Sequence, residues 1–134
     1  MTSSSLQEIA SLEAERAVRS GRWFSLLRLA PSGWLALDVR VGMLEALVRA
    51  YLRRTDGVCR VRDYEIGVVL VETTGRKVLA PLARLKKAIA RELPELDVWI
   101  GWAPVGPEQQ LRWEEAWRWA GQLLVADAAV PAAA

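Results

Sequence analysis

The sequence contains no histidine, only one cysteine and no long apolar run, and each shortage disfavours a class of protein. Without histidine, the chain cannot use Ser–His or Cys–His catalysis, and most zinc sites lose their usual nitrogen ligand. Cys59 has no second thiol for an intrachain disulfide, and its apolar neighbours predict a buried, inert side chain. No apolar stretch approaches the roughly 20 residues that a membrane-spanning helix needs.

A strong charge of one sign is also lacking. The 18 basic and 16 acidic residues leave a formal net charge of +2, which gives no electrostatic reason to expect a nucleic-acid partner. The N-terminus, "MTSSSLQEIASLEAE", has neither the basic start nor the apolar segment of a secretion signal. We therefore expect a soluble cytoplasmic protein that binds neither nucleic acid nor a membrane.

What the sequence does contain is enough apolar material for one core. The chain has 134 residues, 52% of them hydrophobic, and this length matches a single domain. It shows no internal repeat and no linker. We expect one domain over residues 1–134, with flexible ends at 1–5 and 127–134.

Apolar spacing and turn residues divide the chain into helices and strands. In order, the sequence predicts a helix at 5–21, a strand at 22–30, a strand at 34–41, a helix at 42–54, strands at 57–62 and 65–72, a helix at 78–95, a strand at 96–106 and a helix at 107–127. The expected fold class is α/β (α+β). Its core is a ferredoxin-like β-α-β-β-α-β unit, in which helices flank a central, mostly antiparallel sheet.

The stretch "CRVRDYEIGVVL", residues 59–70, places two apolar runs on either side of a short charged turn. This pattern predicts a hairpin. Arg62, Asp63 and Tyr64 at its tip are bulky, whereas a tight two-residue turn favours glycine or asparagine because it needs positive φ. The tip therefore raises the question of whether it serves a function.

The hairpin resembles the signature hairpin of the GGDEF domains, the diguanylate cyclases, which carry Gly-Gly-Asp/Glu-Glu-Phe between two strands. In this sequence the five signature positions are occupied by Arg62, Asp63, Tyr64, Glu65 and Ile66. The segments "EAERAVRSGRWFSLLRL", "LVRAYLRRTD", "LDVWIGWA" and "RWEEAWRWAGQLLVAD" are similar, in this order, to other helices and strands of the family. The resemblance implies a nucleotide-cyclase-like version of the predicted fold.

The same resemblance implies that the catalytic site is degenerate. The family joins two GTP molecules with Mg²⁺ held by carboxylates, and its glycines let the backbone approach phosphate. Where the family has an Asp-x-Asp metal corner after its first strand, this sequence has Ala30, Pro31 and Ser32. Of the two acidic positions of the signature, only the one occupied by Glu65 still carries its acidic residue. We expect no catalytic residues, no metal or other cofactor, and no cyclase activity.

One family motif is retained. Many GGDEF domains carry an Arg-x-x-Asp box five residues before the signature, an inhibitory site where a cyclic di-GMP dimer docks. "RRTD" at residues 53–56 has this spacing. Arg53 can fork onto phosphate or guanine, and Asp56 can accept from guanine. Arg84 resembles a second arginine that some members bring to the ligand, so the resemblance implies a cyclic di-GMP receptor that uses Arg53, Asp56 and Arg84.

The box also has a purely structural interpretation. An arginine near the end of a helix complements the helix dipole, and Asp56-Gly57 is common turn chemistry. The alternative hypothesis is therefore a protein-interaction or dimerisation module that binds no nucleotide.

Seven tryptophans in so short a chain bear on this alternative. Helical spacing predicts a core stripe on the last helix, made of Trp113, Trp117, Ala120 and Leu124. We also expect Trp23 and Trp99 to be core residues of their strands. The other rings, Trp34, Trp102 and Trp119, are candidates for a surface that contacts a second copy or another protein.

Overall fold

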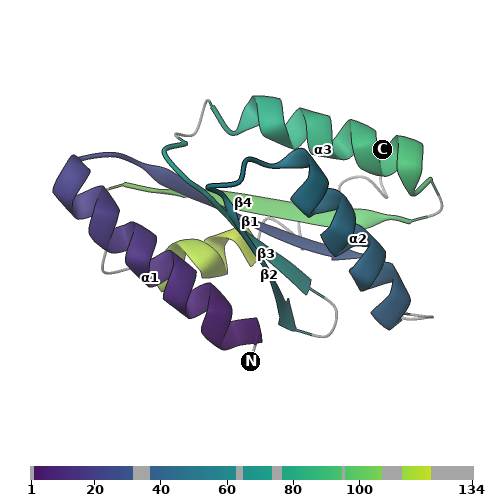
Figure 1. Cartoon of the computed structure of the whole chain (residues 1–134), viewed down its shortest axis with the longest axis horizontal. Coiled ribbons are helices and arrows are strands. Elements are labelled where there is room, and N and C mark those ends of the chain that lie inside the picture. Colours follow the sequence, from purple (N-terminus) through teal and green to yellow (C-terminus); the bar gives the residue numbers. More distant parts are fainter. Residues whose placement is uncertain are drawn as a thin grey trace.

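The computed structural model describes residues 2–31, 37–62, 65–73, 77–94, 96–106 and 113–121. A four-stranded sheet forms the centre, and helices pack on both of its faces (Figure 1). The elements are α1 (Thr2–Ser20), β1 (Phe24–Pro31), α2 (Leu37–Tyr51), β2 (Gly57–Arg62), β3 (Glu65–Leu70), α3 (Leu79–Glu92), β4 (Val98–Val105) and a final helix at 113–121. Within these ranges, no helix combines the length and the apolar character of a membrane span.

The sheet has the strand order β2-β3-β1-β4, and each pair of neighbours is antiparallel. In the central strand β1, Leu27 pairs with Val68 of β3 on one side and with Trp102 of β4 on the other. From β1 to β4 the chain follows the order β-α-β-β-α-β. This is the ferredoxin-like arrangement, so the predicted fold class is confirmed.

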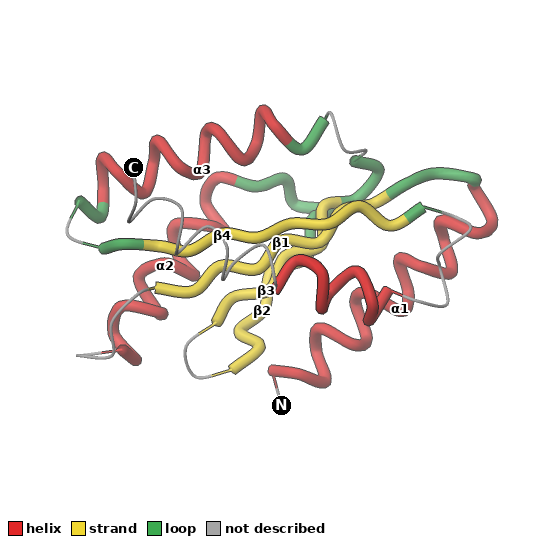
Figure 2. Tube along the Cα trace, turned by 180° about the vertical axis from the view of Figure 1, so that it is seen from behind, coloured by secondary structure: helices red, strands yellow, loops and turns green. Residues whose placement is uncertain are grey.

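Alternation along the strands divides the apolar core into two parts. In β1, Leu27 and Leu29 belong to the core under α2 and α3, whereas Phe24 and Leu26 belong to the core under α1 and the final helix. Figure 2 shows α1 and the final helix together on one face of the sheet. Because both faces are covered, the central strand reads as a nearly continuous apolar run.

The predicted strand at 34–41 is wrong, because α2 already begins within this segment. Val41, Leu44 and Val48 are fully buried at the spacing i, i+3, i+7, which is the buried stripe of a helix. A short alternation of apolar residues cannot distinguish a strand from the first turn of a helix. The sequence also suggested a boundary at Gly42, but this residue lies inside α2.

The tryptophans of the final helix largely match the prediction. Trp113 and Ala120 are buried, and Trp117 packs partly buried against the same core. Trp119, off the stripe, is 64% exposed. Leu124 lies outside the described residues.

The predicted burial of Trp23 and Trp99 is wrong, since each residue is 38% exposed. Trp23 precedes β1, and Trp99 lies on β4, an edge strand of the sheet. Both positions leave part of a large ring without a covering element. Trp102 packs partly buried against the α2–α3 core, and Trp34 lies outside the described residues.

Cys59 is buried on β2, as the sequence predicts. Burial raises the pKa of its thiol to about 11. Because the thiolate is the reactive form, this thiol is inert at neutral pH.

Candidate functional site

The signature-like hairpin is formed by β2 and β3, which pair antiparallel and bring Arg62 opposite Glu65 after a bulge. Glu65 is the first residue of β3, and Ile66 behind it is fully buried. Asp63 and Tyr64 lie outside the described residues, as does the side chain of Arg62. Side chains of the signature-like positions are therefore described only for the last two, Glu65 and Ile66.

Glu65 is buried and bound by an arginine of the neighbouring strand. Its side chain is 2% exposed, and Arg28 of β1 donates from Nη2 to Oε1 at 3.0 Å and from Nε to Oε2. Arg28 pairs with Gly67 in the sheet, so it lies two residues from Glu65 on the same face. Both oxygens of the retained acid are therefore engaged by one guanidinium group.

The same guanidinium group fastens the final helix to the sheet. Arg28 donates from Nη1 to the carbonyl oxygen of Trp117 at 3.0 Å, and its Cζ lies 4.4 Å from the centroid of the Trp117 ring. This is a cation–π contact. A Cβ on Gly121 would lie 2.5 Å from Nη1, so only glycine fits there without a shift. We call Arg28, Glu65, Trp117 and Gly121 the Arg28 cluster.

At the position that the sequence resemblance assigns to the metal corner, β1 ends with Ala30 and Pro31. Ala30 is 8% exposed, and Ser32 lies outside the described residues. In the described part of the chain, no group of three His, Cys, Asp or Glu side chains could hold a metal ion. Glu65 carries a charge that Arg28 already balances.

The Arg-x-x-Asp box lies in the turn between α2 and β2, and its carboxylate is satisfied internally. The side chain of Asp56 is 2% exposed. It accepts from the backbone N–H of Arg53 at 3.1 Å, from Arg53 Nη2 at 3.3 Å and from the backbone N–H of Val71 at 3.0 Å. Asp56 therefore stabilises its own turn and ties it to the end of β3.

Arg53 adds to this connection while remaining open to solvent. Its Nη2 donates to the carbonyl oxygen of Val71 at 2.6 Å and to Oγ1 of Thr73 at 3.2 Å. The side chain is 58% exposed. The two residues of the box are thus joined to each other by an ion pair.

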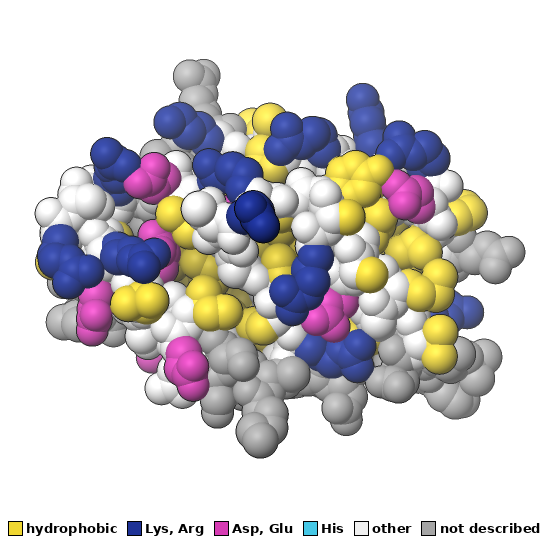
Figure 3. Space-filling model, in the orientation of Figure 1, with side chains coloured by type: hydrophobic (Ala, Val, Ile, Leu, Met, Phe, Trp, Pro, Cys, Tyr) yellow, Lys and Arg dark blue, Asp and Glu magenta, His cyan; other side chains and the backbone are white. Residues whose placement is uncertain are grey.

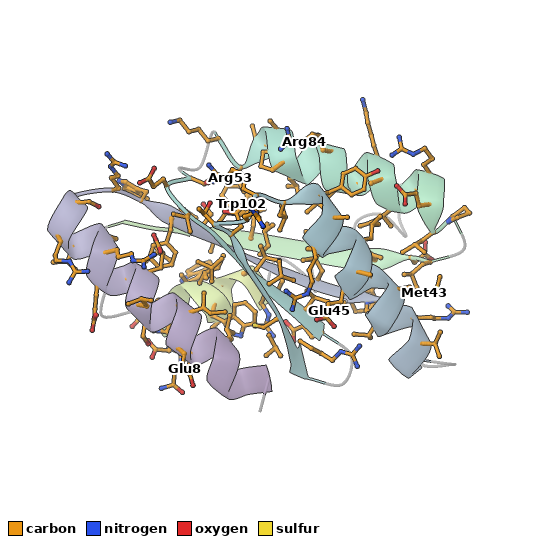
Figure 4. The ribbon with its side chains drawn as sticks, viewed as in Figure 1. Glu8, Met43, Glu45, Arg53, Arg84 and Trp102 are labelled. Carbon is orange, nitrogen blue, oxygen red and sulfur yellow. The ribbon has the colours of Figure 1, made fainter. Side chains whose placement is uncertain are left out.

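Arg84 lies exposed on α3 and makes no hydrogen bond or ion pair with another described residue. Figure 4 shows Arg53 and Arg84 toward the same end of the α2–α3 layer, where α2 ends and α3 begins. No contact joins Arg84 to Arg53 or Asp56 within the described residues.

An open pocket of about 560 Å³ adjoins the Arg-x-x-Asp box at Thr55. Thr55, Val71 and the C-terminal end of α1 line it, including Arg16 and the buried Glu13. Burial raises the pKa of Glu13, because it removes water from the carboxylate, and the ion pair with Arg16 at 3.5 Å compensates this effect in part.

No protein-family model matches the sequence, and no curated protein is similar to it. Solved structures do match the fold. A DGC protein from Thermotoga maritima is 14% identical, with a TM-score of 0.78 over 90% of this chain and 92% of that one. The GGDEF domain of DgcB from Caulobacter crescentus, solved in complex with c-di-GMP, is 12% identical, with a TM-score of 0.74 over 92% and 82%.

The chain has the fold of a GGDEF domain. A third match supports this, the diguanylate cyclase SiaD from Pseudomonas aeruginosa in complex with its activator SiaC. It is 15% identical, with a TM-score of 0.79 over 96% of this chain and 55% of that chain. The fold resemblance that the sequence suggested is therefore confirmed, at identities too low to carry activity from one protein to another.

The Arg28 cluster is the part of this GGDEF fold that the sequence did not predict. Arg28 is a lone charge within the apolar strand "FSLLRLAP", and such a residue needs a buried partner. That signal could have directed attention to Glu65, the other lone charge on a covered strand. The sequence alone does not show that β1 and β3 are neighbours in the sheet, and this was the information needed to pair Arg28 with Glu65.

Proposed function

We propose that this chain is a GGDEF-like signalling domain that does not synthesise cyclic di-GMP and acts through what it binds. The observation that carries the proposal is the engagement of Glu65. The one acid kept from the signature is buried and forked by Arg28.

A magnesium site for triphosphate needs free carboxylate oxygens. Glu65 would have to release Arg28 before it could bind a cation, and Arg28 would then remain beside the metal as a competing positive charge. Ala30 offers no second ligand. The expected chemistry of the hairpin is therefore structural.

The test is incubation of the folded chain with GTP and Mg²⁺ or Mn²⁺, followed by chromatography for cyclic di-GMP and pyrophosphate. We expect neither product. Turnover that disappears in Glu65→Gln would show that Glu65 is catalytic and would overturn the proposal. Circular dichroism of both proteins checks that the comparison is made on folded chains.

Cyclic di-GMP at Arg53, Asp56 and Arg84 stays a prediction. The exposure of Arg53 supports it, as does Arg84, which is exposed and has no partner among the residues that the structure describes. The GGDEF domain of DgcB, solved with this ligand, also supports it. The cost is that Asp56 would have to exchange four internal donor groups for guanine. Binding through the two arginines alone would avoid this cost.

Calorimetry with cyclic di-GMP tests this site. Arg84→Ala is the informative variant, because Arg84 has no hydrogen bond or ion pair with a described residue that the substitution would disturb. If the site exists, this variant weakens binding about tenfold or more. Lys86→Ala removes the same charge from another side of α3, two residues along, and should bind as the unmodified chain does. No heat with the unmodified chain, or equal loss in both variants, contradicts the prediction.

The internal satisfaction of Asp56 favours the second candidate function, a protein-interaction module without nucleotide. Relatives of the fold do bind proteins, since SiaD was solved with its activator. Trp119, 64% exposed, is the predicted contact. Trp119→Ala should leave stability nearly unchanged but reduce any self-association measured by light scattering. An unchanged association would remove Trp119 from the interface.

A further inference from the structure

The solvent side of α3 is basic. The helix carries four basic residues and one acidic residue, Glu92, and its basic side chains are exposed. Figure 3 shows Lys and Arg side chains gathered over α3 at the top of the view. The net charge of +2 conceals this concentration, because α1 and the final helix each carry more acidic than basic residues. We call the exposed side of α3 the basic face.

Like charges are neighbours on this face. Arg84 and Lys87 are three residues apart, and Lys87 and Arg91 are four apart, a spacing at which like charges destabilise a helix. Arg84 and Lys87 make no hydrogen bond or ion pair with another described residue. Arg91 contacts the hydroxyl of Tyr51 at 2.6 Å and Glu92 at 3.4 Å. An anionic partner would relieve this repulsion.

The cations lie on both sides of a row of mostly small side chains. The row follows the spacing i, i+3, i+7, i+10, which is that of the contact positions a and d of a coiled coil. Its members are all exposed and are Ala80, Ala83, Lys87 and Ala90. Arg84 and Arg91 then fall at the e positions on one side of the row, and Lys86 falls at the g position on the other. The face therefore combines a shallow middle with charged sides.

We propose that the basic face binds an amphipathic helix of another protein, one with acidic residues on both sides of its apolar stripe. The alanines let the two helix axes approach to about 8 Å, the short end of helix-packing distances, and leave room for large apolar side chains of the partner. The cations at e and g lie opposite the partner's acids. Lys87 lays its apolar stem along the row while its ammonium group reaches the side.

Two other anionic partners fit this face less well. The apolar side of α3 is buried in the core, so the helix has no large apolar face left to insert into a membrane. On the side of Arg91, α2 lies alongside and contacts it through Tyr51, which keeps α3 from entering a DNA groove about 8.5 Å deep. Alanine methyl groups also offer no hydrogen bonds to base edges.

The basic face is separate from Trp119, so the two surfaces are tested independently. A single docked helix buries less than the roughly 800 Å² per partner of a standard interface. The complex is therefore weak and sensitive to salt, and it needs neither nucleotide nor catalysis.

Fluorescence anisotropy of a labelled synthetic peptide, titrated with the full chain, tests this docking. The probe has about three heptads with Leu at a and d and Glu at e and g, so its own copies repel one another. We expect saturable binding that weakens with added salt, and a gain in helical circular dichroism on mixing. The same peptide with two internal prolines cannot form the helix and should not bind.

Ala83→Arg separates helix packing from simple attraction between charges. This variant adds a positive charge but fills the alanine row, so it should weaken peptide binding about tenfold or more. Attraction between charges alone would make it bind more tightly. Gln7→Arg is the matched control, because it adds the same charge at an exposed position of α1 and should leave binding unchanged.

Arg84→Glu combined with Lys86→Glu reverses the charge on both sides of the row. The double variant should lose the Glu peptide and bind instead a peptide with Lys at e and g. Circular dichroism checks the fold of every variant. The proposal is overturned if the unmodified chain does not bind the probe, if the proline peptide binds equally well, or if Ala83→Arg binds more tightly. Binding of phosphatidylserine vesicles or a DNA duplex in place of the peptide, lost in the double variant, also overturns it.

Discussion

The Arg28 cluster and the Arg53–Asp56 turn both contain an arginine bound to a buried carboxylate, yet they place the arginine differently. Arg28 is 12% exposed in the centre of the sheet, whereas Arg53 is 58% exposed at its margin. In the cluster, both charges have left water, and the guanidinium is the only partner of Glu65 among the described residues. In the turn, Asp56 also accepts hydrogen bonds from the backbone N–H groups of Arg53 and Val71.

This difference teaches that a retained motif residue has no fixed role. Glu65 stands where the sequence resemblance places the signature glutamate, but its surroundings make it a partner for Arg28. Asp56 stands where the resemblance places the aspartate of the ligand box, but its surroundings make it a turn-stabilising acceptor. Burial and the donors at hand decide what each carboxylate does.

The largest expected effect is that of Arg28→Ala. It leaves Glu65 buried without a partner and releases the final helix from the sheet, so stability should fall by about 3–5 kcal/mol. Urea unfolding measures the loss. Arg28→Met combined with Glu65→Gln should recover part of it, because no charge stays buried. A loss below that of an exposed ion pair would contradict the structural role of the cluster.

Asp56→Ala should cost less, about 1–3 kcal/mol, because four donor groups lose their acceptor but can partly turn to water. Arg53→Ala serves as the matched comparison, since it removes the exposed partner and leaves the backbone donors to Asp56 in place. It should cost no more than about 1 kcal/mol. Equal losses in the two variants would show that the ion pair, and not the carboxylate as acceptor, stabilises the turn.

Glu13 extends the comparison to a buried carboxylate with a poor partner. Its folded-state pKa is raised from the ordinary 4.5, chiefly by burial. The fold therefore binds this proton more tightly than the unfolded chain does. The resulting stability is complete below pH 4.5 and is lost as pH rises through the raised folded pKa. We expect Glu13→Gln to remove this loss, seen as a flatter stability profile in urea unfolding at several pH values.

The smallest effect belongs to Arg22 and Glu72, an ion pair whose side chains are 60% and 52% exposed. Water screens both charges, so Arg22→Ala should change stability by no more than about 0.5 kcal/mol. Thermal unfolding at low and high salt should show little difference between variant and parent. A large loss of stability in Arg22→Ala would mean that the exposure of an ion pair does not predict how much it contributes to stability.

Much of the fold was predictable because it rests on local patterns. The hairpin at 57–72 and the helix at 78–95 have apolar periods long enough to identify them, and the structure has both, with somewhat different bounds. The segment at 34–41 was predicted wrongly, because its apolar alternation is short and α2 starts inside it. The exposure of Trp23 likewise depends on which elements cover the start of β1, which no local pattern contains.

The sequence by itself determined most of the elements, apart from the segment at 34–41, and the replacement of the residues in the signature that the hairpin resembles. Only the tertiary structure decided that Arg28 lies beside Glu65, 37 residues away in the chain, and that Asp56 reaches Val71. The physical reason is the range of the interactions. Helical and strand periods are set by neighbours along the chain, whereas the partner of a buried charge is set by which strands lie side by side.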